Sequence, residues 1–292
     1  MIFFRKLLIG PLRKLRSAMG RQKLLAIGGT VVIIYMLVTA LAPWLVPYDP
    51  VEYRSAPRLA PPSLQHPMGT DQLQRDLFSR VISGARAPII VAFGSIALSM
   101  SVGTLFGLIA GYVGGALDRA FSLTMDALYS FPSIILAIVL VSVLQPGIDT
   151  MILAISVVYI PTYFRVTRSE VLTIKEETFI EAVHAMGASP VRTVFKHIAP
   201  NVVNAIMAVS SFNIADAILT EAALAYLGFG LPPPTPDWGF DIQNGQKFLQ
   251  AGYWWLVTFP GLMIVFLSLG FGLVGEGISD LLNPKRQQRK TG

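Results

Sequence analysis

Few side chains in this sequence have the types and spacing that catalysis requires. There is no cysteine, which excludes thiolate catalysis, disulfides and cysteine metal sites. His66, His184 and His197 share no metal-ligand spacing, and neither His-Glu-x-x-His nor Gly-x-Ser-x-Gly occurs. The phosphate-binding pattern Gly-x-x-x-x-Gly-Lys-Ser/Thr is also missing. We therefore expect a non-catalytic protein without a metal or other cofactor of its own, and any energy it uses must come from another chain or from a gradient.

The residues whose spacing is most informative lie in an amphipathic segment between long apolar stretches. This segment, residues 165–200, is called the island below. Thr178 and Glu181 have the spacing of a capping box, which predicts that a helix begins there. Gly187 suits the left-handed position that ends a helix. At helical spacing, one face of this first helix collects apolar side chains: Phe179, Ile180, Val183 and Met186.

A second short helix is predicted directly after the glycine. Ser189 and Pro190 suit its N-cap and first turn, and Pro200 is expected to close it. Two such helices facing the cytoplasm indicate a docking surface for a partner. The competing interpretation is an ordinary helical hairpin that lies on the membrane, with Glu181 only a cap and Gly187 only a stop.

The composition indicates a membrane protein around this island. Of the 292 residues, 53% are hydrophobic and 14% are charged, whereas a soluble domain carries about 25% charged residues. About 20 apolar residues cross a bilayer core. The charge-poor stretches are residues 24–46, 88–112, 127–144, 151–164, 201–220 and 254–275. We expect an all-α polytopic protein with six transmembrane helices, the first of which exceeds the apolar length of a cleaved signal peptide.

The distribution of basic residues predicts the orientation in the membrane. With the N-terminus inside, 17 of the 23 Lys and Arg residues lie in segments expected to face the cytoplasm. Those segments are residues 1–23, 113–126, 165–200 and 276–292. The chain should therefore be a multi-pass protein of the cytoplasmic (inner) membrane with both termini in the cytoplasm. The formal net charge of +6 is explained by this topology and by contact with lipid, so no nucleic-acid partner is expected.

The cytoplasmic island resembles the "EAA" loop of ABC importer permeases. That pattern is Glu-Ala-Ala, three residues, Gly, nine residues and Ile-x-Leu-Pro. Four residues match it in register: Glu181, Ala182, Gly187 and Pro200. Three positions depart from it: Val183, His197 and Ala199.

Two other segments narrow the resemblance to the "C" permease type of the dipeptide, oligopeptide and nickel subfamily. Residues 66–80 look like its Gly-Thr-Asp-x-x-Gly-Arg-Asp stretch, with Gln74 at the usual glycine. Residues 227–239 resemble its outer loop. The resemblance covers nearly the whole chain past residue 24. It implies an ABC type I importer permease fold and ATP-driven import of di- or oligopeptides. Nickel, metal chelates or glutathione-like compounds, transported by the same machinery, are alternative cargoes.

The resemblance also implies partners. They are a second related permease, two cytoplasmic ATPases that hold ATP-Mg, and an extracytoplasmic substrate-binding protein. The island would insert a coupling helix into a groove on the ATPase. The residues expected to make this contact are Glu181, Ala182, Val183, Met186, Gly187 and Ala188.

A few polar residues outside the island have weaker functional interpretations. Asp216 lies inside the fifth apolar stretch near Asn213, where a carboxylate costs about 2.5–3.5 kcal/mol on insertion scales. It would either line the pathway and meet a peptide amine or a cation, or make a structural hydrogen bond. An acid pair with Asp126, as in an intramembrane enzyme, is improbable because Asp126 lies at a helix end. In the outer loop, Asp237 and Trp238 would face the binding protein or pack within the loop.

The expected organisation follows from these assignments. The first segments are a basic cytoplasmic N-terminus (1–23), a peripheral first transmembrane helix (24–46) and an extracytoplasmic cap segment (47–87). A permease core of five helices (88–285) follows, with coupling loop 165–200 and outer loop 221–253. A cytoplasmic tail (286–292) ends the chain. A gradient-driven carrier or channel is the alternative class, although one large helical cytoplasmic loop fits it poorly.

Overall fold

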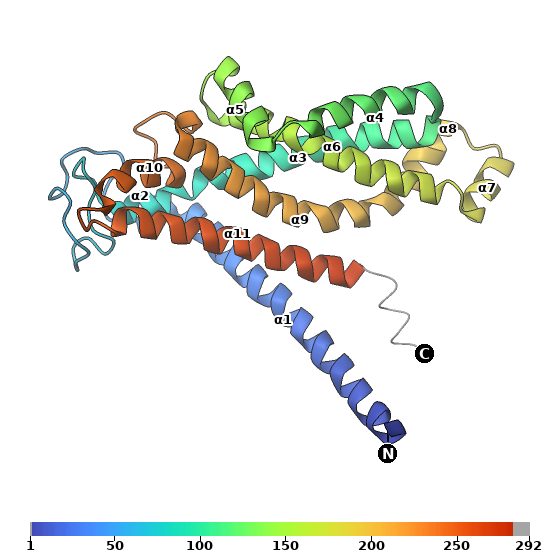
Figure 1. The fold of residues 1–292 in the computed structure, drawn as a ribbon, viewed down its shortest axis with the longest axis horizontal. Coiled ribbons are helices and arrows are strands. Elements are labelled where there is room, and N and C mark those ends of the chain that lie inside the picture. The colour runs from blue at the N-terminus through green and yellow to red at the C-terminus, as the bar shows by residue number, and fades with distance from the viewer. Residues whose placement is uncertain (1, 283–292) are drawn as a thin grey trace.

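The computed structural model describes the backbone of residues 2–282 and the side chains of residues 23–280. Within this part of the chain all the regular elements are helices. Most of the long ones lie side by side as a bundle, and the first diverges from it toward its N-terminal end (Figure 1). The long helices are α1 (Ile2–Leu45), α3 (Arg86–Val113), α4 (Gly115–Ser130), α5 (Ser133–Leu144), α6 (Ile148–Ile174), α9 (Ala199–Leu224) and α11 (Trp255–Leu282).

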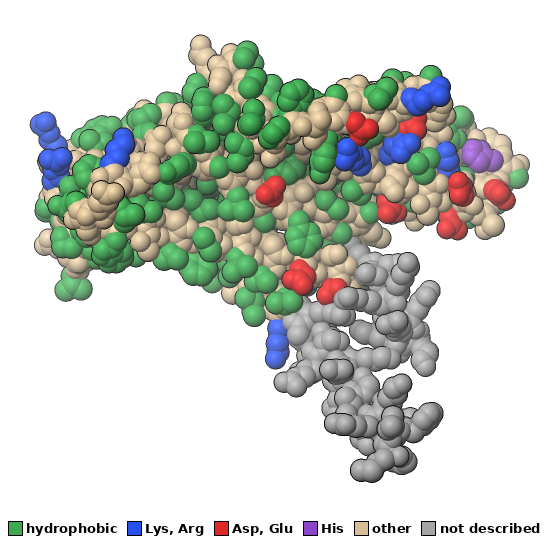
Figure 2. Space-filling model, viewed as in Figure 1, with side chains coloured by type: hydrophobic (Ala, Val, Ile, Leu, Met, Phe, Trp, Pro, Cys, Tyr) green, Lys and Arg blue, Asp and Glu red, His purple; other side chains and the backbone are tan. Residues whose placement is uncertain are grey.

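The remaining helices and two π-helical turns cover the ends of the bundle. At one end lie α2 (Leu77–Gly84), the π-helical turn η2 (Ala225–Phe229) and α10 (Trp238–Leu249). At the other end lie α7 (Thr178–Ala185), α8 (Pro190–Arg192) and the π-helical turn η1 (Thr193–Ile198). Figure 2 shows charged side chains gathered toward the ends, and mostly apolar side chains along the middle. This is the surface that a lipid bilayer requires.

Five helical stretches are long and apolar enough to cross a membrane. They are Lys23–Leu45, Leu77–Val113, Ile148–Ile174, Pro190–Phe229 and Trp255–Asp280. The short apolar stretch 151–164 is thus the middle of a longer helix that includes its polar flanks. The all-α fold expected from the sequence is confirmed.

The stretch 127–144, expected to be the third span, is bent in the structure. It contains the end of α4 and all of α5, which meet at an angle of 93°. The break falls at Phe131-Pro132, where Phe131 has an extended backbone (φ −78°, ψ 138°). A residue that precedes proline avoids the α conformation because the proline ring clashes with its backbone. The pair counts as a sixth span only if both helices are taken together.

The centre of the bundle is the contact between α3 and α6. Small residues recur every fourth position along α3: Ser95, Ser99, Gly103, Gly107 and Gly111. A Cβ atom on Gly103 would lie 2.6 Å from the carbonyl oxygen of Ile160, so only glycine allows this approach. The hydroxyl groups of Ser99 and Ser156 donate to each other's helix, at 3.0 Å to Ser156 O and 3.2 Å to Ser95 O.

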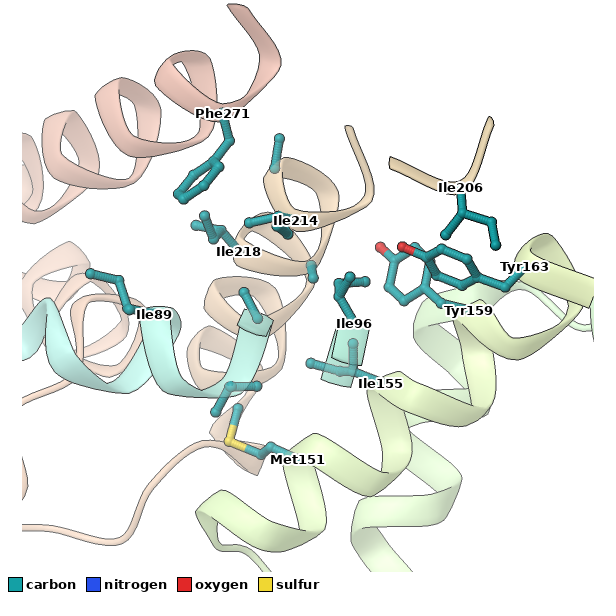
Figure 3. Close-up of a cluster of buried hydrophobic side chains, with 14 of the residues drawn as sticks. Ile89, Ile96, Met151, Ile155, Tyr159, Tyr163, Ile206, Ile214, Ile218 and Phe271 are labelled. Atoms are coloured by element: carbon teal, nitrogen blue, oxygen red, sulfur yellow. The ribbon is translucent and has the colours of Figure 1, made fainter. Parts of the chain in front are cut away.

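Helix α9 closes the core over α3 and α6. Figure 3 shows Tyr159 and Tyr163 projecting from α6 toward α9, beside apolar side chains such as Ile96 and Ile214. The Tyr163 hydroxyl donates to Ser210 Oγ at 3.1 Å. The α6–α9 contact is therefore apolar with a few hydrogen bonds, as helix pairs in a membrane require.

The loops 47–76 and 230–237 pack with α2 and α10 into a cap. Its centre is a buried ion pair in which Arg80 donates to Asp241 Oδ1 at 2.7 Å and to Pro50 O at 2.9 Å. His66 lies 2.8 Å from the buried Asp76 carboxylate.

Gln74 adopts the left-handed conformation (φ 63°) at the position of the expected glycine, so the turn forms without glycine. Asp71 supports this turn by accepting from the amides of Leu73 and Arg75 at 2.8 and 2.9 Å.

Candidate functional site

The hairpin formed by α7, α8 and η1 is held firmly on the bundle. Ile180 of α7 and Ile198 of η1 are almost fully buried, with 1% and 0% of their surface exposed. Gly187 is left-handed (φ 77°), as predicted, and the amide of Ala188 donates to Val183 O at 3.3 Å. The predicted N-cap also forms, because Ser189 Oγ accepts from the amide of Arg192.

Two local predictions for this hairpin are wrong. The Thr178–Glu181 capping box does not form, since Glu177 is the N-cap and no side chain accepts a hydrogen bond there. Pro200 does not close the second helix, which continues through it into α9. Proline lacks an amide hydrogen, and the wide π-turn of η1 directly before it lets the chain pass without that donor.

Several large apolar side chains of the hairpin are exposed, together with charged side chains such as Glu181. Met186, Val191 and Phe195 expose 78%, 69% and 56% of their surface. Glu181 and Ala182 are also exposed, so most of the expected coupling residues lie on this surface. Val183 is the exception, because 6% of it is exposed and it packs inside the chain. Exposed apolar side chains in a cluster are typical of a docking surface.

Ion pairs between α4 and α6 brace this end of the bundle. Arg168 donates to Asp118 at 2.7 Å, and Arg165 donates to Asp126 at 2.7 Å. The Arg165 guanidinium also lies 4.2 Å from the centre of the Tyr129 ring. The sequence did not predict these ion pairs, since nothing local shows that α4 folds back along α6.

A cavity of about 420 Å³ opens at the α4–α5 break. Asp216 and Asn213 of α9, both predicted to line a pathway, lie in its wall, together with Tyr159 of α6. The Tyr159 hydroxyl donates to Asp216 Oδ2 at 2.6 Å. The remaining lining residues are Leu128, Tyr129, Phe131, Ser133, Leu136, Val158 and Thr162. A space of this size is within the range of about 300–1,000 Å³ that small-molecule sites occupy.

Asp237 and Trp238 of the outer loop are packed inside the chain. They are 0% and 1% exposed and lie inside the cap. Trp238 Nε1 donates to Val81 O at 2.8 Å, and Asp237 Oδ1 accepts from the amides of Gly239 and Phe240 at 2.9 and 3.2 Å. Of the two interpretations left open by the sequence, the burial supports packing within the loop, where Asp237 caps α10.

The buried carboxyl of Asp237 predicts how the stability of the protein depends on pH. Burial raises the pKa of this carboxyl from 3.8 to about 6, and the carboxyl groups of Glu221 and Asp241 lie near it. Between about pH 4 and pH 6 the folded state then binds more protons than the unfolded state. The contribution of Asp237 to the free energy of unfolding should therefore fall, by about 3 kcal/mol, as the pH rises through this window.

The measurement is denaturant unfolding in mild detergent at pH 4.5 and pH 7, for the native chain and Asp237→Asn. Asparagine keeps the cap but does not titrate. We expect the stability of the native chain relative to the variant to be higher at pH 4.5. A difference that stays constant across pH would contradict the buried, protonated carboxyl.

Metal binding finds no support in the geometry. No group of three or more His, Asp or Glu side chains is placed to hold a metal ion among the residues that the structure describes. The three histidines lie at different places, His66 in the cap and the other two in the hairpin.

Comparison with known proteins identifies the family to which this bundle belongs. Residues 103–288 match the family described as binding-protein-dependent transport system inner membrane component. The chain belongs to this family. Residues 11–62 match the N-terminal transmembrane domain of oligopeptide transport permease C. The resemblance expected from the island and the outer loops is confirmed, and the chain is a multi-pass membrane component of the ABC transporter permease type.

Curated relatives cover almost the whole chain. The dipeptide transport system permease protein DppC of Alkalihalophilus pseudofirmus is 36% identical over 277 residues, which are 95% of this chain and 91% of the relative. The protein of the same name from Haemophilus influenzae is 38% identical over 268 residues, 90% of each chain. The glutathione transport system permease protein GsiD of Pectobacterium atrosepticum is 34% identical over 276 residues, which are 94% of this chain and 91% of the relative.

A solved structure supports the fold. The permease matches a chain of the inward-facing MetNI methionine ABC transporter with a TM-score of 0.57 and 19% identity, over 71% of this chain and 98% of that chain. At this identity the likeness concerns the arrangement of helices alone.

Proposed function

We propose that this permease is the membrane-spanning subunit of an ATP-driven importer of di- or oligopeptides. The observation that carries the proposal is a hairpin with exposed apolar side chains, held through buried Ile180 and Ile198 on a bundle of the importer family. Peptide cargo is supported by relatives at 36% and 38% identity that are named dipeptide permeases.

The hairpin is the proposed contact with the ATPase. Its exposed members Glu181, Ala182 and Met186 would enter a groove on that partner, with Gly187 and Ala188 forming the turn that presents them. Val183 would act from inside, by holding α7 on the bundle. Closure of the ATPases would then move the hairpin together with α6 and α9, to which it is joined.

The remaining partners follow from the family. A second related permease would complete the pathway, and a substrate-binding protein would dock on the cap. ATP-Mg would be held by the two ATPases, so hydrolysis resides on other chains. Both termini would lie in the cytoplasm, because the basic residues collect on the side of the hairpin. The division into a peripheral first helix, a cap and a five-helix core is part of the same proposal.

The test is purification of the permease from its own source in mild detergent, followed by mass spectrometry of the proteins that accompany it. We expect a P-loop ATPase and a second permease in the complex. A substrate-binding protein that binds a labelled dipeptide would identify the cargo class. Recovery as a lone, stable oligomer would refute the importer and favour a carrier or channel.

A second cargo is favoured by one observation. The glutathione permease at 34% identity indicates that this scaffold also serves a modified tripeptide. Nickel and metal chelates would use the same route, with selection by the binding protein. Direct binding of glutathione, but not of a dipeptide, by the co-purified binding protein would favour this alternative.

A further inference from the structure

The cavity at the α4–α5 break has one charged side chain in its wall. Asp216 is that residue, and the rest of the lining consists of neutral polar, aromatic and aliphatic side chains. Asp216 is exposed to this space and is not packed away in the core. The electrostatic potential inside the cavity is therefore set largely by a single carboxylate.

The two arginines of α6 form ion pairs with other carboxylates and none with Asp216 among the described residues. Arg165 binds Asp126 and Arg168 binds Asp118, both at 2.7 Å. No Lys or Arg forms an ion pair with Asp216 within the part of the chain that the structure covers. A carboxylate at membrane depth without a cation is expensive, and such groups mark substrate or ion pathways.

The carboxylate is also held in a fixed orientation. The Tyr159 hydroxyl donates to Oδ2 at 2.6 Å, and among the described residues no second side chain donates to Oδ1. One oxygen is thus used for positioning, and the other has no side-chain donor among the described residues. This arrangement suits a ligand that brings several N–H donors and a positive charge.

Two further features of the wall suit an organic cation. The aromatic residues Phe131 and Tyr159 line the same space, and aromatic faces attract an ammonium group. Tyr129 also lines it, but its ring already lies against the Arg165 guanidinium. The helix break at Phe131-Pro132 places irregular backbone at membrane depth, which is tolerated where it lines a cavity. Broken helices of this kind surround substrate sites in other transporters.

We propose that the cavity binds the cargo through its free N-terminal ammonium group, with Asp216 as the anionic partner and Tyr159 as the residue that orients it. This rests on the proposed function, since it assumes peptide cargo. It assigns a cargo specificity to this permease in addition to any selection by the binding protein. Peptides whose amine is acylated would lose this contact.

The experiment uses the full importer in proteoliposomes, with its own binding protein, and compares radiolabelled dialanine with N-acetyl-dialanine. In the Asp216→Asn variant, uptake of dialanine should fall about tenfold or more, because a hydrogen bond to a charged group is lost. Uptake of the acetylated peptide should change little. Selection by the binding protein is the same for the native importer and the variant. It therefore cancels in the ratio of variant uptake to native uptake, taken for each peptide.

Three further variants separate binding from folding. Asp216→Glu keeps the charge and should restore much of the preference, and Tyr159→Phe should lower dialanine uptake less than Asp216→Asn does. Asp149→Asn removes an exposed acid from the first turn of α6, outside the cavity, and should have no effect. Each variant is first checked for assembly by co-purification.

The outcomes are distinct. Equal loss of both peptides in Asp216→Asn, or no loss of either, would overturn the ammonium site while leaving the importer intact. If the native complex takes up neither peptide, the proposed peptide cargo itself has failed.

Discussion

Replacement of Ala182 by arginine should abolish uptake while leaving the permease folded in the membrane. Ala182 is exposed on α7, and arginine is a good helix former, so the hairpin itself should tolerate the change. If this surface enters a groove on the ATPase, a long charged side chain must be buried there without a partner. Such burial costs about 2–5 kcal/mol, which corresponds to a loss of affinity of at least about thirtyfold.

The measurement is recovery of the ATPase with affinity-tagged permease, together with peptide uptake in proteoliposomes. The matched control is Ala116→Arg, an exposed alanine in the first turn of α4 at the same end of the bundle. Ala182 is a cleaner choice than Gly187, where φ of 77° means that a side chain would also strain the turn. Normal ATPase recovery and normal uptake with Ala182→Arg would exclude the hairpin as the coupling surface.

Alanine at both Gly103 and Gly107 should force α3 away from α6 and destabilise the bundle. A Cβ atom would lie 2.6 Å from Ile160 O at the first position and 2.8 Å from Phe164 O at the second. Because both contacts are with backbone, rotation of a side chain cannot relieve them. Overpacking of this kind costs about 1–3 kcal/mol at each site, so the double variant should lose several kcal/mol.

Thermal unfolding in mild detergent measures this effect, and the chain provides a matched control. Gly29 and Gly272 also lie within long helices, and a Cβ atom on either would meet nothing within 4 Å. Alanine at these two positions should leave the midpoint unchanged or raise it, because alanine favours helix over glycine by up to about 1 kcal/mol. Equal midpoints for the two double variants would mean that α3 and α6 are not in close contact.

Local features of the hairpin were predictable because they depend on a few neighbouring residues. Gly187 was expected to be left-handed and Ser189 to cap the second helix, and both are so. The capping box failed although its spacing was correct, since Thr178 is the first helical residue and not the cap. The pattern indicates that a helix begins nearby, but it does not fix the first residue.

The membrane character was equally readable from the sequence. Long charge-poor stretches predict spanning helices because a bilayer core excludes charge and requires internally bonded backbone. The stretch 127–144 shows where this reasoning ends. Its composition is that of a span, but the chain bends by 93° at Phe131-Pro132. Hydropathy measures composition and carries no information about direction.

The sequence by itself determined the membrane class, the family and the position of the helical hairpin, because these depend on composition and on motifs of adjacent residues. Only the tertiary structure decided which side chains meet. It joined Tyr159 to Asp216 across 57 residues and Arg80 to Asp241 across 161, and it buried Val183, Asp237 and Trp238. Contacts over such separations follow from how whole helices pack, which depends on the shapes of both partners at once.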